Sequence, residues 1–252
     1  MKRANYHTHT WRCKHANGTE REYIEAAIAA GMEALGFSDH VPWPFRDYIS
    51  PIRMGMGELP GYFDTLLQLK DEYKGRIDIK IGFEAEYLPG YWEELQTQLS
   101  KYPVDYMIMG QHYLEEEIPC NYMSRVGDKE ELLARYVDTV LEGMKTGTFS
   151  YLAHPDLPKF TGNRNFYAMQ MERLCVGCKE LGIPLEMNLS GVYENVHYPN
   201  EEFWKIAAKV GVDAVIGYDA HNPTLLLQEQ TYQMCLAWAG SMGVNIREDF
   251  RI

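Results

Sequence analysis

The sequence has little positive charge and no long hydrophobic run. Lys and Arg total 24 against 36 Asp and Glu, which gives a formal charge of −12. A nucleic-acid-binding surface needs a basic footprint, so this balance argues against a nucleic-acid partner. Because no apolar stretch suits a membrane span or a signal peptide, we expect no membrane partner and a cytoplasmic location. A small anionic substrate stays compatible with the charge, since bound metal ions can reverse the field locally.

Cysteine is scarce, and nucleotide-binding motifs are missing. The five cysteines are an odd number at scattered positions, which does not suggest a disulfide framework and fits a reducing cytoplasm. Cys175 and Cys178 form a C-x-x-C without a second ligand pair at zinc-site spacing, so we expect them to pack against the core on a helix. Neither G-x-G-x-x-G nor G-x-x-x-x-G-K-[ST] is present, so a nucleotide-binding fold is not supported.

Short apolar runs alternate with amphipathic helical patterns along the 252 residues. The runs predict strands at 3–7, 34–38, 77–84, 104–111, 150–153, 184–188 and 213–218. The helical patterns lie near 19–32, 58–74, 90–100, 128–146, 165–182 and 200–210, with a last helix from about 223. This alternation indicates an α/β fold with a parallel sheet, and the length favours a closed barrel over an open doubly wound sheet. No composition break or linker divides the chain, so we expect a single domain over residues 1–252.

Seven of the eight histidines fall at or just beyond the ends of predicted strands, and two acidic residues share this placement. In a parallel barrel the carboxyl ends of all strands open onto one face, so these side chains should converge. The set comprises His7, His9, His15, His40, Glu84, His112, His154, Asp219 and His221. Residues i and i+2 of a strand point to one side, so His7 with His9, and Asp219 with His221, can each grip one ion. His197 lies in a polar loop without a partner and is expected to be an ordinary residue.

Nine ligands exceed what one metal ion takes. A catalytic metal usually keeps about three protein ligands and one open position, so the set predicts two to three divalent transition-metal ions, with Glu84 as a bridge. Imidazole and carboxylate donors suit zinc, iron or manganese. Such a positive centre favours a phosphate ester and an attacking hydroxide that the ions bind between them.

These residues lie in sequence blocks that resemble the polymerase-and-histidinol-phosphatase (PHP) family. The blocks are HTHTWRCKH at 7–15, GFSDH at 36–40, GFEAEY at 82–87, GQHY at 110–113, AHPD at 153–156 and GYDAH at 217–221, in the family's order. Within the family, the chain is most similar to stand-alone histidinol-phosphate phosphatases. The resemblance implies a distorted, TIM-like (β/α)7 barrel with a trinuclear metal site at the C-terminal ends of its strands.

The resemblance also implies how the ligands are shared. One ion would be held by His7, His9, Glu84 and Asp219, a second by Glu84, His112 and His154, and a third by His15, His40 and His221. One departure concerns the substrate: such phosphatases often carry an Arg after strand six, in a Gly-Leu-Arg-Lys run. Here the stretch reads MNLSGVYEN, which keeps Asn188 but has Tyr193 at the Arg position.

Asn188 and Tyr193 are therefore candidate substrate-binding residues. Arg12, Lys14, Lys159 and Arg164 lie in strand-end loops and could supply the missing cation, although each is also an ordinary surface charge. The acidic stretch 115–117 could attract a substrate amine or be a solvated loop.

We predict a metal-dependent phosphomonoesterase with Glu84, Asp219 and Asp39 as catalytic residues. Asp39 would orient His40, protonate the leaving group, or cap the following loop. L-histidinol phosphate is the favoured substrate, which would be hydrolysed to histidinol and phosphate in histidine biosynthesis. The alternatives are another phosphomonoester or phosphotyrosine as substrate, a nuclease, an amidohydrolase, and a non-enzymatic metal-binding protein. The oligomeric state stays open.

Overall fold

The sheet is built from parallel strands that follow one another in chain order. A computed structural model describes residues 3–46, 48–115, 117 and 122–252. The strands are β1 (Ala4–Asn5), β2 (Ala34–Phe37), β3 (Asp78–Ala85), β4 (Tyr106–Met109), β5 (Phe149–Leu152), β6 (Leu185–Asn188), β7 (Asp213–Gly217) and β8 (Asn245–Ile246). The seven predicted strands are all present. β8 is an addition that sequence reading missed, because two residues carry no apolar pattern.

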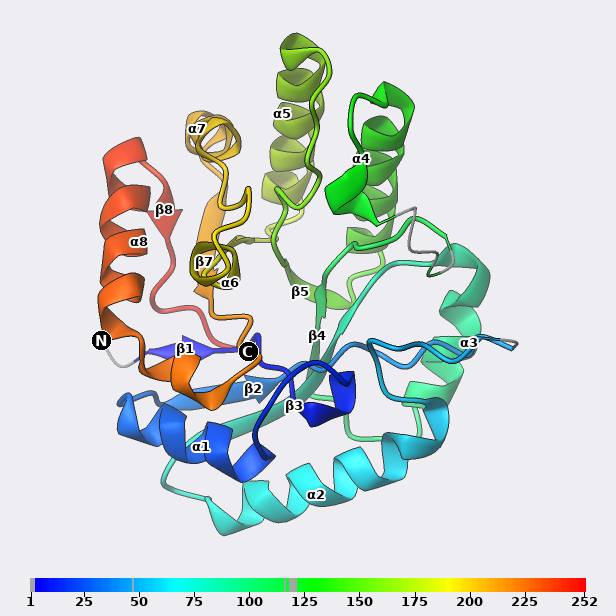
Figure 1. Ribbon diagram of the computed structural model, residues 1–252, viewed down its shortest axis with the longest axis vertical. Helices are drawn as coiled ribbons and strands as arrows, with labels where there is room; N and C mark the ends of the chain where they lie inside the picture. The colour runs from blue at the N-terminus through cyan, green and yellow to red at the C-terminus, as the bar shows by residue number, and fades with distance from the viewer. Residues whose placement is uncertain (1–2, 47, 116, 118–121) are drawn as a thin grey trace.

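The helices surround the curled sheet (Figure 1). They are α1 (Glu20–Ala29), α2 (Leu59–Glu72), α3 (Pro89–Leu99), α4 (Glu130–Met144), α5 (Arg164–Glu180), α6 (Ser190–Tyr193), α7 (Glu201–Val210) and α8 (Glu229–Met242). The short α6 was not predicted. The last helix starts later than expected, because Pro223–Leu227 first forms a 3₁₀ turn. Within the described residues, no helix is long and apolar enough to cross a membrane.

Local sequence signals explain several of these elements. Thr19 and Glu22 form a reciprocal capping box that starts α1. Leu133, Val137 and Val140 recur at helical spacing in α4 and are fully buried against the sheet. Cys175 and Cys178 are buried as free thiols on α5, so the expectation of core packing is confirmed.

The barrel closes between β1 and β7 without regular strand pairing. Tyr218 N donates to the side-chain Oδ1 of Asn5 at 3.1 Å, so an amide side chain takes the place of a ladder carbonyl. Further along, His9 N donates to Ala220 O at 3.0 Å, and Ala220 N donates to His7 O at 3.2 Å. β8 pairs only with the start of β7. The expected distorted (β/α)7 barrel is thus confirmed, with β8 added at its amino end.

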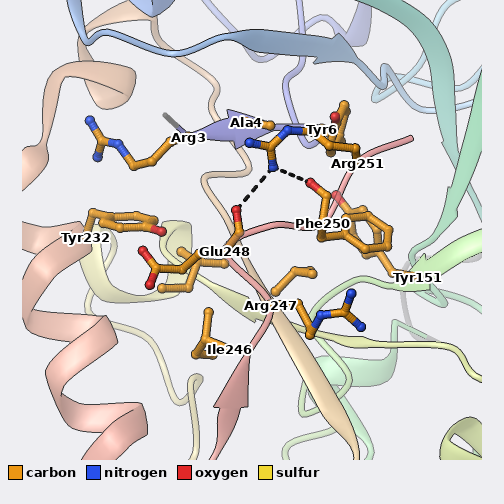
Figure 2. Close-up of a pocket in the computed structure, with 12 residues that line it drawn as sticks. Arg3, Ala4, Tyr6, Tyr151, Tyr232, Ile246, Arg247, Glu248, Phe250 and Arg251 are labelled. Atoms are coloured by element: carbon orange, nitrogen blue, oxygen red, sulfur yellow. Dashed lines mark hydrogen bonds between the residues drawn. The ribbon is translucent and has the colours of Figure 1, made fainter. Parts of the chain in front are cut away.

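Aromatic side chains fill the interior of the barrel at this amino end. Tyr6, Tyr106 and Tyr151 belong to a separate buried cluster there, and Tyr106 donates a hydrogen bond to Tyr6 O at 2.7 Å. The chain after β8 crosses the opening and packs Phe250 onto Tyr6 and Tyr151, with ring centroids 6.2 and 6.0 Å away (Figure 2). This end of the barrel is therefore plugged, and the carboxyl end is left for function.

Candidate metal centre

The nine predicted ligands meet at the carboxyl end of the barrel. Each lies in or just after a strand. Three follow β1, two follow β7, one follows each of β2, β4 and β5, and Glu84 lies in β3. The members are His7, His9, His15, His40, Glu84, His112, His154, Asp219 and His221. Donor atoms of His7, His9 and Glu84 lie within 4.8 Å of one another, as do those of His9, His40 and His221. The expected convergence is therefore present in the fold.

Glu84 lies at the middle of this set. It is almost fully buried near the end of β3, and its two oxygens face ring nitrogens from five histidines. These are His154 at 2.8 Å, His40 at 2.9 Å, His9 and His112 at 3.5 Å, and His7 at 3.6 Å. A carboxylate surrounded in this way can bridge two ions, because each oxygen faces a different group of rings.

Asp219 forms a second focus beside Glu84. Its Oδ1 lies 3.4 Å from His7 Nε2 and 3.2 Å from His9 Nε2. His221 stacks on His9 with ring centroids 4.2 Å apart, and its Nε2 lies 3.0 Å from His15 Nε2. Two imidazole nitrogens that face each other at this distance can share a proton or a metal ion.

Groups behind the histidines fix the direction of the rings. A carboxylate can only accept, so His7 Nδ1 donates to Glu186 Oε1 at 2.8 Å and His112 Nδ1 donates to Glu86 Oε1 at 3.1 Å. His15 Nδ1 lies 2.6 Å from Cys13 O, and His221 Nδ1 lies 3.0 Å from Asp219 O. Each contact leaves Nε2 free to face the centre, which is how outer partners orient metal-ligating imidazoles.

Several buried polar atoms at the centre have no hydrogen-bond partner among the described residues. They are His7 Nε2, both ring nitrogens of His9, His154 Nδ1 and Glu84 Oε2. Buried polar atoms are normally paired, because an unpaired one loses its hydration without compensation. Such a concentration of unpaired nitrogen and oxygen donors fits the chemistry of a divalent metal cluster.

Glu84, Asp219 and His9 have the charge states that metal ligands need. Burial alone would raise the pKa of Glu84, but the neighbouring His112, His7 and His40 outweigh burial and hold it well below its ordinary value. Burial would likewise raise the pKa of Asp219, and His7 and His221 lower it well below normal. Burial and the nearby His221 hold the pKa of His9 well below its usual range. The two carboxylates are thus ionised and His9 is neutral, the forms that bind metal.

Two of the predicted ligands lie on strained backbone. His154 has φ 30° and Asp219 has φ 47°, in the left-handed region that non-glycine residues seldom adopt. The surroundings hold His154 in place, because its N donates to Glu186 Oε2 at 3.1 Å and its carbonyl accepts from Leu157 N at 2.9 Å. Strain of this kind is retained mainly at functional sites.

The sequence profile of the PHP domain matches residues 5–190 of this chain. The chain belongs to the PHP family. A probable histidinol-phosphatase of Deinococcus radiodurans is 35% identical to this PHP chain over 228 residues, which is 86% of this chain and 85% of the relative. The histidinol-phosphatase of Bacillus subtilis is 25% identical over 254 residues, 88% of this chain and 94% of the relative.

Solved structures carry the same fold as the PHP chain. The crystal structure of histidinol phosphate phosphatase from Lactococcus lactis, complexed with zinc, L-histidinol and phosphate, superposes with a TM-score of 0.73 at 18% identity and covers 97% of this chain and 95% of that one. A putative histidinol phosphatase from Listeria monocytogenes gives 0.74 at 20% identity, covering 91% and 99%. The family resemblance and its barrel are therefore confirmed.

A cavity of about 340 Å³ opens above the centre. Its floor is formed by seven of the nine predicted ligands. Its walls come from the loops that follow the strands, and comprise Ile52, Tyr113, Tyr122, Leu157, Ser190, Glu194 and Tyr198. Within the described part of the chain, no Lys or Arg lines it.

The predicted cations are all engaged elsewhere. Arg12 is buried, pairs with Glu20 at 3.0 Å and stacks on Trp11. Lys14 donates to Ser50 O at 2.6 Å. Arg164 is 86% exposed on its side chain and lies 3.3 Å from Glu202, on a different part of the surface. None of these three residues lines the cavity, and Lys159 lies with Arg164 on that other part of the surface.

Asn188, Tyr193 and Asp39 also lie outside the cavity lining. Asn188 Nδ2 donates to Glu186 Oε2 at 2.9 Å and to Asp219 Oδ2 at 3.2 Å, so it positions a ligand. Tyr193 is half-buried and packs against the hydrophobic core. Asp39 accepts from Thr10 N and Thr10 Oγ1, both at 2.8 Å, and burial raises its pKa to about 6. Asp39 thus anchors the turn between His9 and His15, and its oxygens bind Thr10 in place of the His40 ring.

Glu186 is the residue that sequence reasoning missed. It is fully buried in β6, where it contacts His7, the His154 amide and Asn188. A signal was available: a Glu inside the buried strand 184–188 is expensive unless it has partners. Glycines make room for these carboxylates, because a Cβ on Gly110 would collide with Glu84 Oε1 and one on Gly217 would collide with Glu186 Oε1.

Proposed function

We propose that the chain is a single-domain, metal-dependent phosphomonoesterase that hydrolyses L-histidinol phosphate to L-histidinol and phosphate. One observation carries the metal-dependent chemistry. Nine nitrogen- and oxygen-bearing side chains converge at the base of an open cavity, and several of their buried donor atoms have no hydrogen-bond partner within the described residues. The substrate follows the relatives, which bear the names histidinol-phosphatase and probable histidinol-phosphatase.

The residues at the centre fit two to three divalent ions. His7, His9, Glu84 and Asp219 would hold one, Glu84 with His112 and His154 a second, and His15 with His40 and His221 a third. Zinc, iron and manganese all suit imidazole with carboxylate. When bound, such ions polarise the phosphoryl oxygens and lower the pKa of a bound water to about 7.

The protein's own groups would position the reacting atoms. The carboxylates of Glu84 and Asp219 are ionised and would hold the positive charge of the site in place. Glu186 and Glu86 hold the rings of His7 and His112 from behind, so the ligand geometry is set before substrate arrives. The loops carrying Tyr122 and Tyr198 would limit water access around the bound ester.

A phosphoester panel tests this proposal. Protein stripped with a chelator and reconstituted with manganese or zinc should hydrolyse L-histidinol phosphate and release inorganic phosphate, with phosphodiesters and amides as controls. Elemental analysis should find two to three ions per chain. The stripped protein should unfold at a lower temperature, because bound ions stabilise only the folded state.

Each negative result has its own meaning. Hydrolysis of another phosphomonoester with histidinol phosphate inert would remove the named substrate and keep the chemistry. No turnover of any phosphoester by fully loaded protein would remove the chemistry as well. At most one bound ion after reconstitution would contradict the cluster.

A further inference from the structure

The outer wall of the cavity carries one carboxylate and no cation among the described residues. Glu84 and Asp219 belong to the floor, so the remaining acidic group of the lining is Glu194, directly after α6. Within the described structure, the Glu194 side chain forms no ion pair. The wall is therefore negative above a centre built for a phosphate.

Two neutral aromatic rings accompany Glu194. Tyr122 stands over His112 with ring centroids 6.1 Å apart, and Tyr198 stands 6.1 Å from His154. Glu194, Tyr122 and Tyr198 line the same cavity, and burial raises the pKa of both phenols, so both rings are neutral. A carboxylate beside neutral aromatic faces is the environment that binds an organic ammonium group.

The other acidic side chains near the cavity are already paired. Glu115 lies 2.6 Å from Arg135. Glu117 is buried, accepts from Arg53 at 2.7 Å and binds Ser50 at 2.8 Å. Glu116 lies outside the described residues. The described members of the stretch 115–117 are thus engaged in structure, and Glu194 is left to meet a substrate cation.

We infer that Glu194, flanked by Tyr122 and Tyr198, binds the cationic group of a phosphomonoester whose phosphate lies at the metal centre. The inference rests on the proposed function and makes Glu194 the residue that selects esters of amino alcohols over uncharged esters. The metal ions would bind the phosphate of the substrate, and Glu194 in the cavity wall would bind its cationic group.

Two substrates and three variants test this. L-histidinol phosphate carries an ammonium group, and p-nitrophenyl phosphate carries none. Glu194→Gln keeps the size and removes the charge, and Glu194→Lys inverts it. Glu201→Gln is the matched control, because Glu201 is exposed on α7 and pairs only with Lys205 among the described residues.

Glu194→Gln should raise KM for histidinol phosphate about 3–10-fold, because Gln keeps an acceptor oxygen and loses only the difference between a charged and a neutral hydrogen bond. The kcat should be largely kept. KM for p-nitrophenyl phosphate should stay unchanged. Glu194→Lys should raise KM for histidinol phosphate further and lower KM for p-nitrophenyl phosphate. Calorimetry of histidinol binding to metal-loaded protein should show the same order without turnover.

A KM ratio between the two esters that is the same in wild type and both Glu194 variants would overturn the inference and leave the phosphatase proposal standing. An equal effect of Glu201→Gln would overturn it too, since it would reflect net charge alone. If the metal-loaded wild-type protein hydrolysed neither ester, the result would contradict the proposed function itself.

Discussion

Imidazoles and carboxylates crowd the carboxyl end of the barrel, whereas aromatic rings fill the amino end. At the amino end the three arginines that line the opening are paired: Arg3 with Glu229, Arg247 with Asp213 and Arg251 with Glu33. At the carboxyl end, buried nitrogens and oxygens lack partners within the described structure, and two of the predicted ligands, His154 and Asp219, have φ angles in the left-handed region. Both ends belong to the same barrel. The unpaired polar atoms and strained backbone at the carboxyl end are therefore features that lower stability and serve the functional site.

Four substitutions test this contrast, and Glu84→Gln should have the largest effect. The change keeps the size and removes the charge that faces five imidazoles. Metal content should fall, and hydrolysis should drop by more than about 100-fold, since changes behind a ligand already cost about 10–100-fold. Elemental analysis measures the metal content, and phosphate release measures the rate of hydrolysis.

His197→Ala is the matched control for Glu84→Gln. His197 is half-buried, and its Nε2 binds Leu157 O at 2.7 Å, away from the centre. Its loss should leave metal content and activity near wild type. If it proved as damaging as Glu84→Gln, the division of the histidines into ligands and ordinary residues would be wrong.

Gly110→Ala should have the second largest effect, because its new side chain would displace the same Glu84 carboxylate. The new Cβ would meet Glu84 Oε1, so Glu84 or β4 must move. We expect about 1–3 kcal/mol of lost stability and a loss of bound metal. Thermal unfolding and elemental analysis check this. Gly240→Ala, in open space on α8, is the control and should stabilise by about 0.5–1 kcal/mol.

Glu186→Gln should have a smaller effect, since Glu186 acts through His7. The amide keeps an oxygen for the His7 ring but loses the charge that strengthens the bond. We expect metal affinity or activity to fall about 10–100-fold with the fold retained. Titration with a metal indicator gives the affinity. An unchanged affinity would reduce Glu186 to a structural role.

Phe250→Ala should have the smallest effect on function, because it lies at the other end of the barrel. Removing a partly buried ring that packs on Tyr6 and Tyr151 should cost about 1–3 kcal/mol, or roughly 2–12 °C in Tm. At 25 °C, kcat/KM and metal content should match wild type. A loss of metal in this variant would show that the two ends are coupled.

Periodicity and the placement of histidines were enough to predict β1 to β7, the helices other than α6, and the set of side chains that converge at the carboxyl end. Parallel strands present their carboxyl ends at one face whatever their exact register, so residues just after strands 3–7, 34–38 and 213–218 had to meet. β8 escaped prediction because two residues carry no pattern. The closure through the Asn5 side chain escaped because it depends on a contact between residues 5 and 218.

Side-chain direction belongs to the tertiary structure alone. The sequence placed Arg12, Lys14, Arg164 and Tyr193 in loops near the site, but a loop's path decides whether a side chain faces a cavity or a neighbour. Likewise, the role of Glu186 follows from its 2.8 Å contact with His7, which lies 179 residues away. The sequence by itself determined which residue types stand at the strand ends, because local patterns set the elements. Only the fold decided which of them touch, because those contacts join segments far apart in the chain.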